Sequence, residues 1–246
     1  PNKTENMKLK FSPGNAKLKG IPSISLSAGW ACPFAFRCES RVDMLTGKIT
    51  DGKHTEVRCF SATQENIFPV VRKQREYNFN LLRSLKSSEE MAELIHVSLP
   101  NPKKKIIRIH VSGDFFNINY LKAWILVAQR NPNLTFYAYT KSLTYWIEEL
   151  NNIPVNLKLT ASKGGKNDHL IEQYNLKFAQ VVYSIEEAEQ LGLEIDHDDS
   201  HAFSGNKSFA LLIHGTQPKK SFAGKAKQTL ANNGWTGYNR KIKIAA

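Results

Sequence analysis

Short apolar runs alternate with helical patterns along most of this chain. Apolar residues at i, i+3 and i+4 predict helices over 119–130, 143–151, 167–174, 185–191 and 221–232. Between and before these helices, six runs of β-branched and aromatic residues predict strands: 21–27, 105–112, 134–139, 156–161, 178–183 and 208–214. Strands that alternate with helices in this way indicate a parallel sheet with helices packed against it.

The longest helical patterns lie between the first two predicted strands. One covers 62–84, where Pro69 is expected in an early turn or at a kink. The other covers 87–99 and opens with Ser-Ser-Glu-Glu, a sequence typical of a capped helix N-terminus. Pro100 and Pro102 are expected to end it.

The strand composition defines the fold class. The run at 106–111 (Ile-Ile-Arg-Ile-His-Val) and the run at 210–213 (Ala-Leu-Leu-Ile) are too continuously apolar for a sheet with one face in water. We therefore predict an α/β fold, a parallel sheet with flanking helices. About six strand–helix units fit either a doubly wound sheet or an incomplete (β/α) barrel. Residues 1–20 are polar and basic, and predict a surface arm before a single α/β domain over 21–246.

The chemistry is expected at three cysteines, Cys32, Cys38 and Cys59, after which no cysteine follows. An odd number argues against a disulfide framework. Three thiolates that converge can hold an iron–sulfur cluster with one open iron, or a zinc ion with a fourth ligand from elsewhere. They can also be small buried hydrophobes.

The spacing of the cysteines bears on which metal they would bind. Structural zinc sites usually use close pairs such as Cys-x₂-Cys, whereas five and twenty residues separate these cysteines. A Cys₃His zinc site using His54 is an alternative. A [4Fe–4S] cluster whose fourth iron is open, or bound by His, Asp or a small molecule, fits the surrounding residues better.

Polar residues and glycines end the predicted strands, and in parallel α/β folds ligands bind at the carboxyl ends of the strands. We expect catalytic groups at His110, Asp114, Lys141 and His214, and cofactor-binding groups at Ser112, Gly113, Asp114, Tyr139, Thr140, Ser162 and Lys163. Several of these have a purely structural alternative, such as Asp114 as a helix cap or His110 as an interior histidine.

The overall charge points to anionic partners. A formal net charge of +12 and a pI near 9.6 favour nucleic acid or an anionic small molecule, although lysines can also serve only to solvate the surface. No apolar run approaches the roughly 20 residues that span a membrane. The first residues have no apolar signal segment, so we expect a cytoplasmic protein with reduced thiols.

Several segments together resemble a phage family, the gene product 88 proteins of mycobacteriophages. They are 32–38 (Cys-Pro-Phe-Ala-Phe-Arg-Cys), 58–62 (Arg-Cys-Phe-Ser-Ala), 108–116 (Arg-Ile-His-Val-Ser-Gly-Asp-Phe-Phe), 137–142 (Tyr-Ala-Tyr-Thr-Lys-Ser) and 209–218 (Phe-Ala-Leu-Leu-Ile-His-Gly-Thr-Gln-Pro). The resemblance covers roughly residues 20–220. It implies a phage protein that acts in the host cytoplasm, and it brings little else about function.

A more distant similarity is to radical S-adenosylmethionine enzymes, in which three cysteines after the first barrel strand hold a [4Fe–4S] cluster. That resemblance implies an incomplete (β/α) barrel, with Cys32, Cys38 and Cys59 as cluster ligands. It places Ser112, Gly113 and Asp114 where the cofactor would bind. The Cys-x₃-Cys-x₂-Cys loop of that superfamily is absent here.

These observations lead to two hypotheses from different classes. The first is a cluster-binding protein that, if catalytic, would cleave S-adenosylmethionine reductively at the open iron. Lys141 and Lys163 would hold an anionic substrate, and His110 or His214 would serve as proton donor or fourth ligand. The second is a basic nucleic-acid-binding protein with a structural cluster or zinc and no catalysis.

Overall fold

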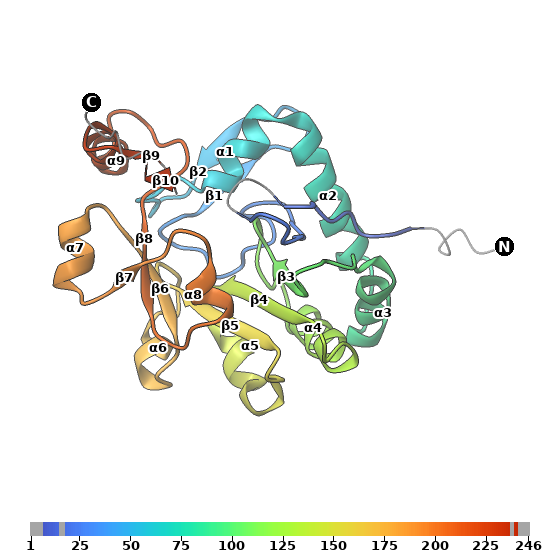
Figure 1. The fold of residues 1–246 in the computed structure, drawn as a ribbon. Helices are drawn as coiled ribbons and strands as arrows, with labels where there is room; N and C mark the ends of the chain where they lie inside the picture. Colours follow the sequence, from blue (N-terminus) through green and yellow to red (C-terminus); the bar gives the residue numbers. More distant parts are fainter. Residues whose placement is uncertain (1–6, 15–17, 237–238, 241–246) are drawn as a thin grey trace.

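The computed structural model describes residues 7–14, 18–236 and 239–240, and its centre is a six-stranded parallel sheet (Figure 1). The strands lie in the order β3-β4-β5-β6-β8-β7. Their bounds are β3 (Ile106–Ile109), β4 (Thr135–Thr140), β5 (Leu157–Ser162), β6 (Phe178–Val182), β7 (Glu194–Ile195) and β8 (Phe209–Leu212). Five of the six predicted strands are confirmed, and the predicted parallel sheet with flanking helices is confirmed with them.

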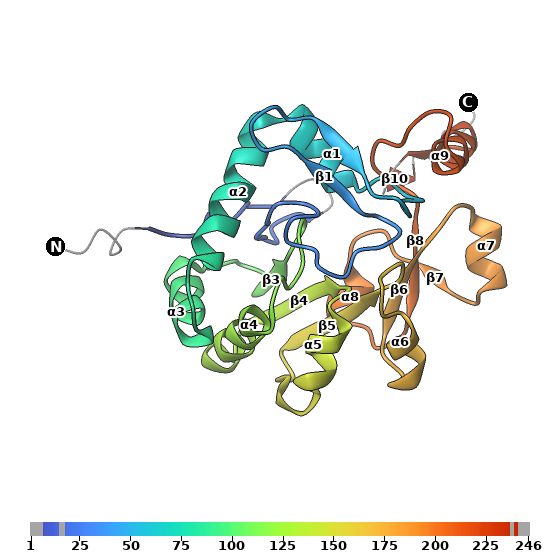
Figure 2. The same ribbon diagram turned by 180° about the vertical axis from the view of Figure 1, so that it is seen from behind.

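Helices follow the strands as the sequence predicts. They are α4 (Ile118–Arg130), α5 (Leu143–Glu148), α6 (His169–Gln173), α7 (Ile185–Gln190) and α9 (Phe222–Asn232). From β3 to β6 the strands keep their chain order. Right-handed connections between neighbours in this order place every connecting helix on the same face. Figures 1 and 2 show α4, α5 and α6 along one side of the sheet.

Both faces of the sheet are covered, which explains the continuous apolar runs. In β4, Phe136 and Ala138 pack into the main core with α4, while Tyr137 packs on the opposite face with Phe203. A short helix on that second face, α8 (Ser200–Phe203), was not predicted, because its four residues carry no helical pattern. Strand β7 was also missed, since two residues are too short to show alternation.

The chain before the sheet forms three helices and a hairpin. Pro69 divides the predicted 62–84 helix into α1 (Phe60–Ile67) and α2 (Pro69–Arg83), and Pro69 is the first residue of α2. Helix α3 (Ser88–Ser98) has the predicted capping box, formed by Ser87 and Glu90. Two antiparallel strand pairs among the described residues were not predicted. They are formed by β1 (Ser40–Val42) with β2 (Ile49–Asp51) and by β9 (Trp235–Thr236) with β10 (Asn239–Arg240).

The predicted strand over 21–27 is not a regular strand. The segment runs beside β3 with one parallel bridge between Ser23 and Arg108. Pro22 has no N–H to donate, and beyond Ile109 the backbone of His110 turns to φ 63°, so a regular ladder cannot continue. Hydrogen bonds nevertheless join the two segments, including one of 2.8 Å from Leu26 N to the Ser112 carbonyl. The extended segment thus ends beside the end of β3.

The described part of the N-terminal arm lies on α2 and α3. The N–H of Leu9 donates to Ser98 Oγ at 2.9 Å, and the N–H of Lys10 donates to Asn78 Oδ1 at 2.8 Å. Leu9 and Leu18 are both buried. No helix within the described ranges is long and apolar enough to cross a membrane.

Candidate metal centre

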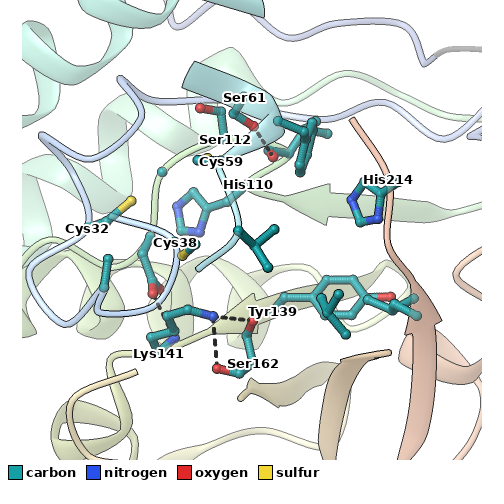
Figure 3. Close-up of a pocket in the computed structure, with 18 of the residues that line it drawn as sticks. Cys32, Cys38, Cys59, Ser61, His110, Ser112, Tyr139, Lys141, Ser162 and His214 are labelled. Carbon is teal, nitrogen blue, oxygen red and sulfur yellow. Dashed lines mark hydrogen bonds between the residues drawn. The ribbon is translucent and has the colours of Figure 1, made fainter. Parts of the chain in front are cut away.

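A cavity of about 190 Å³ lies at the carboxyl ends of the strands, and all three cysteines line it (Figure 3). One water needs roughly 10–15 Å³ by the same measure, so this cavity has room for a larger group. Most of the predicted site residues share its wall. They are His110, Ser112, Gly113, Asp114, Tyr139, Lys141, Ser162 and His214. Thr140 and Lys163 are not part of this wall.

The loop that carries Cys32 and Cys38 is held against the end of β5. Ala35 and Gly165 form an antiparallel bridge. The N–H of Arg37 donates to the Gly164 carbonyl at 2.9 Å, and the N–H of Lys166 donates to the Phe34 carbonyl at 3.0 Å. Backbone contacts therefore fix the position of this loop, and the glycine turn after β5, at Gly164 and Gly165, supports it.

Cys59 is positioned by a separate set of contacts. It is the residue before α1, and its N–H donates to Ser40 Oγ in the first hairpin at 3.3 Å. The amide of Gln217 pairs with the neighbouring Arg58 backbone at 2.9 Å in both directions. Arg58 also forms an ion pair with Asp51 of β2. The hairpin and the segment after β8 thereby bring Cys59 to the cavity that Cys32 and Cys38 line.

Two of the thiols, those of Cys32 and Cys59, are held in their protonated form. Burial raises the pKa of Cys32 well above its usual value, and the neighbouring charges of Asp114, Cys59 and Cys38 raise it further. Burial and the charge of Cys38 raise the pKa of Cys59 to about 11. A nucleophilic cysteine needs the opposite, a lowered pKa. Cys32 and Cys59 are therefore unsuited to act as thiolate nucleophiles, and a bound metal would have to displace their protons.

Asp114 connects the end of β3 to the end of β4. Its carboxylate accepts hydrogen bonds from Thr140 Oγ1 at 2.6 Å and from the backbone N–H groups of Lys141 and Phe115, both at 2.7 Å. Burial raises the pKa of Asp114, and these hydrogen bonds oppose that effect. Asp114 and Thr140 thus position the strand ends.

Lys141 and Lys163, predicted to bind an anion, have protein partners. Lys141 Nζ donates to Ser162 Oγ at 2.6 Å and to the carbonyls of Ser162 and Lys163 at 2.9 and 3.2 Å (Figure 3). Lys163 lies over the Phe178 ring and lines a second cavity of about 420 Å³. That cavity shares Cys38 and Lys141 with the first, so the two adjoin.

His110 is almost fully buried in the wall of the first cavity. Its Nε2 lies 3.1 Å from the Tyr120 hydroxyl, and its Nδ1 has no hydrogen-bond partner among the described residues. Burial, together with the charge of Arg108, lowers the pKa of His110 to about 3, so the ring is neutral. The backbone φ of 63° is unusual for a residue other than glycine and costs about 1–2 kcal/mol.

The remaining predicted residues lie on the far side of the same cavity. His214 Nδ1 lies 3.0 Å from the Leu212 carbonyl, and its ring packs against Phe60. The Tyr139 hydroxyl donates to Asp199, a buried carboxylate that also pairs with Arg108 at 2.6 Å. Neither Arg108 nor Asp199 was singled out from the sequence, because the two are 91 residues apart.

Glu65 is another supporting residue that the sequence did not reveal. It is fully buried on α1, and its Oε1 accepts from the Ala28 N–H at 2.9 Å and from Arg75 at 3.2 Å. Ser112 Oγ donates to the same oxygen at 3.3 Å. Glu65 thus joins the cysteine loop to the end of β3. No sequence pattern marked Glu65, because the buried residues of α1 (Ser61, Ala62, Thr63 and Glu65) are mostly polar.

The cysteines and their neighbours do not match the arrangement that a single metal ion requires. Within the described part of the chain, no group of three or more His, Cys, Asp or Glu side chains has the arrangement of a metal-ion site. Zinc needs four ligands at about 2.0–2.3 Å from one point. His54, the alternative nitrogen ligand, is exposed and stacks on Phe36. In a cubane cluster each ligand binds a different iron, so its thiolates stand further apart. Among the described residues, the three cysteines share a cavity wall without forming a ready site for a single metal ion.

Comparisons with known proteins identify a phage family. A model of the family described as "Gene product 88" matches residues 2–233. A gene 88 protein of Mycobacterium phage L5 is 29% identical over 140 residues, and one of Mycobacterium phage D29 is 28% identical over 140 residues. Each alignment covers 53% of this chain and 52% of the relative, so the chain spans about half the length of both. No solved structure matches, and the similarity to radical S-adenosylmethionine enzymes gains no support.

Proposed function

This chain belongs to the gene product 88 family of bacteriophage proteins, and we propose that it binds a [4Fe–4S] cluster through Cys32, Cys38 and Cys59. One observation carries the proposal: three cysteines from two separate segments line one cavity at the carboxyl ends of parallel strands. We place this activity in the host cytoplasm, where thiols stay reduced.

The electrostatics of the cavity agree with a cation-binding site. The pKa values of Cys32 and Cys59 are raised because each thiolate would lie near other negative charges in a buried place. Bound iron supplies the positive charge that reverses this effect, and protons are released as the thiolates bind. A bound cluster would then offset part of the negative charge that the thiolates bring to this cavity.

Three cysteines leave one iron of such a cluster without a thiolate. That iron takes its ligand from another side chain or from a small molecule. The sequential order of β3 to β6 is compatible with an incomplete (β/α) barrel, in which a small molecule would lie among the strand ends. S-adenosylmethionine belongs to this proposal as a candidate ligand, and formation of 5′-deoxyadenosine under reducing conditions tests it. The adjoining cavity beside Lys163 offers room for an anionic substrate.

Reconstitution distinguishes a cluster from zinc and from plain core cysteines. Metal-free protein is incubated without oxygen with ferrous iron and sulfide, and in parallel with zinc. About four irons and four sulfides per chain are expected, with loss of most of that iron in Cys32→Ala, Cys38→Ala and Cys59→Ala. Ser61→Ala, which also alters the cavity wall, is the matched control and should keep the cluster. Tight binding of one zinc without cluster assembly would refute the proposal.

The net charge of +12 favours a second candidate, a nucleic-acid-binding protein whose metal is structural. Phosphate contacts release counterions, so such binding weakens steeply with salt. Fluorescence anisotropy with generic DNA and RNA at 50 and 200 mM salt tests it. A fall in affinity of about 10³-fold or more would support this candidate. Absence of binding at 50 mM salt would eliminate it.

A further inference from the structure

Among the described residues that line the cysteine cavity, His110 is the one whose side chain has a buried polar atom without a hydrogen-bond partner. The side chain is 3% exposed and lines the cavity with the three cysteines. Figure 3 shows its ring directed toward the side of the cavity where Cys32 and Cys38 lie. Its Nδ1 is fully enclosed and has no hydrogen-bond partner in the part of the chain that is described. Buried polar atoms are almost always paired, so this exception needs an explanation.

The backbone and the second nitrogen both hold the ring in place. His110 has φ 63°, and strained backbone of this kind persists where the surrounding structure fixes a functional group. The Tyr120 hydroxyl lies 3.1 Å from Nε2. Metal-binding histidines usually hydrogen-bond through the nitrogen that is not a ligand, which fixes the tautomer. With the proton on Nε2 and donated to Tyr120, Nδ1 has its lone pair available for a metal.

The other polar groups of the cavity are already engaged. Both carboxylate oxygens of Asp114 accept hydrogen bonds, and Ser112 Oγ donates to Glu65. His214 Nδ1 lies 3.0 Å from the Leu212 carbonyl. The contacts of Asp114 and Ser112 would have to break before either could bind a metal, whereas Nδ1 of His110 has no hydrogen-bond partner to lose among the described residues.

We infer that His110 is the fourth protein ligand of the cluster, binding through Nδ1 the iron that has no cysteine. This inference rests on the cluster of the proposed function and makes the site Cys₃His, so that His110 takes the place of S-adenosylmethionine as the ligand of the fourth iron. The Tyr120 hydroxyl is then a positioning group that accepts from Nε2–H.

The test uses the full chain with its cluster assembled, labelled with ¹⁵N-histidine and reduced for pulsed EPR. The wild-type cluster is expected to show magnetic coupling to a histidine nitrogen, which needs no variant. That coupling is expected to disappear in His110→Ala and to persist in His214→Ala, the matched control on the same cavity wall. In Tyr120→Phe the coupling should persist while the reduction potential shifts upward, because the imidazole loses a partner that increases its donation to iron.

The outcomes separate this inference from the proposed function. If the wild-type protein assembles no cluster, both are wrong. If the cluster forms and shows no histidine coupling, or keeps that coupling in His110→Ala, only the assignment of His110 is overturned. Formation of 5′-deoxyadenosine from S-adenosylmethionine by the wild-type protein would also overturn it, because that cofactor needs the same iron open.

Discussion

At the scale of single residues, Gly113 shows how closely the chain segments approach beside the cavity. Its φ is 86°, and a Cβ at this position would lie 2.7 Å from Leu26 Cβ. The residue therefore serves two needs at once: a left-handed backbone and contact with the extended segment that leads to the cysteine loop. The sequence suggested a cofactor-binding role for it, while the structure shows this close packing role.

Replacing Gly113 with alanine is expected to destabilise the protein by about 3 kcal/mol or more, the sum of backbone strain and overpacking. Gly192→Ala is the control, because Gly192 has a similar φ of 64° but nothing within 4 Å of its Cβ position. That variant should lose only about 1 kcal/mol. Urea denaturation of both variants measures the difference, and equal losses would contradict the packing explanation.

The sequence indicated which residues gather at the site better than it indicated what they do. Cys32, Cys38 and Cys59 line one cavity, as expected from the rule that strand ends share an edge. For Asp114 and Lys141 the hydrogen bonds are to other strand ends, and these partners are invisible in a linear sequence. Glu65 and Gln217 were not among the predicted site residues, since their contacts join segments far apart along the chain.

At the scale of secondary-structure elements, the segment after β8 holds Cys59 through Gln217. This side chain is 8% exposed and exchanges two hydrogen bonds with the Arg58 backbone, both of 2.9 Å. Its amide also donates to the His214 carbonyl at 3.1 Å. A single amide therefore connects the last strand of the sheet to the start of α1.

Gln217→Met keeps the length of the side chain and removes these hydrogen bonds, leaving backbone groups of Arg58 unpaired. We expect a loss of about 2 kcal/mol in the free energy of unfolding. Iron retained per chain should also fall, because Cys59 loses its support. The exposed Gln228→Met in α9 should change stability by less than about 0.5 kcal/mol. Calorimetry and iron analysis check both, and unchanged stability in Gln217→Met would refute this role.

The short helix α8, missed from the sequence, carries a pH-sensitive contact. His201 lies 2.9 Å from Asp196 and 3.2 Å from Glu194. Partial burial lowers the pKa of His201, but the hydrogen bonds to these two carboxylates outweigh it and raise the pKa above its usual value. The protonated ring therefore stabilises the folded state.

Because the pKa of His201 is raised in the folded state, its protonated ring stabilises the folded protein at pH values below the unfolded pKa of about 6.5. This stabilisation is lost as the pH rises through the folded pKa. The unfolding free energy of the wild type should therefore fall, relative to that of His201→Gln, as pH rises from about 6 to 8. The exposed His96→Gln in α3 is the control and should track the wild type. Parallel urea curves at each pH give the comparison, and a constant difference between wild type and His201→Gln would contradict it.

Prediction of the elements themselves depended on their length and pattern. The thirteen residues of α4 carry a full amphipathic pattern and were predicted within one residue of each end. From the sequence, Pro69 was expected in an early turn of one helix or at a kink, because a proline fits either place. In the structure it begins a second helix, α2. The irregular course of 21–27 could not be predicted, since it depends on the left-handed backbone of His110.

At the scale of the whole molecule, the cavity is built where separate parts of the fold meet. The cysteine loop lies against the glycine turn after β5, and Cys59 is held by the first hairpin and the segment after β8. A cluster bound there would connect the N-terminal third of the chain to the sheet. Removing the cluster should consequently loosen the cysteine-bearing segments far more than the rest of the fold.

Removing the cluster by chelation without oxygen is expected to lower the melting temperature by several degrees, because a group that binds only the folded state adds its binding energy to stability. Hydrogen exchange should accelerate most at residues 27–39 and 57–61. Amides of α4 should change least, as they lie in the main core. Uniform acceleration across the chain would contradict a local role for the metal.

The most direct test is the iron and acid-labile sulfide content of the wild-type protein purified without oxygen, measured with its visible absorption spectrum. The proposed site predicts a brown protein with about four irons and four sulfides per chain. A colourless protein with one zinc per chain would make the metal structural. A colourless protein without metal would show that Cys32, Cys38 and Cys59 are core residues, and the central claim would be wrong.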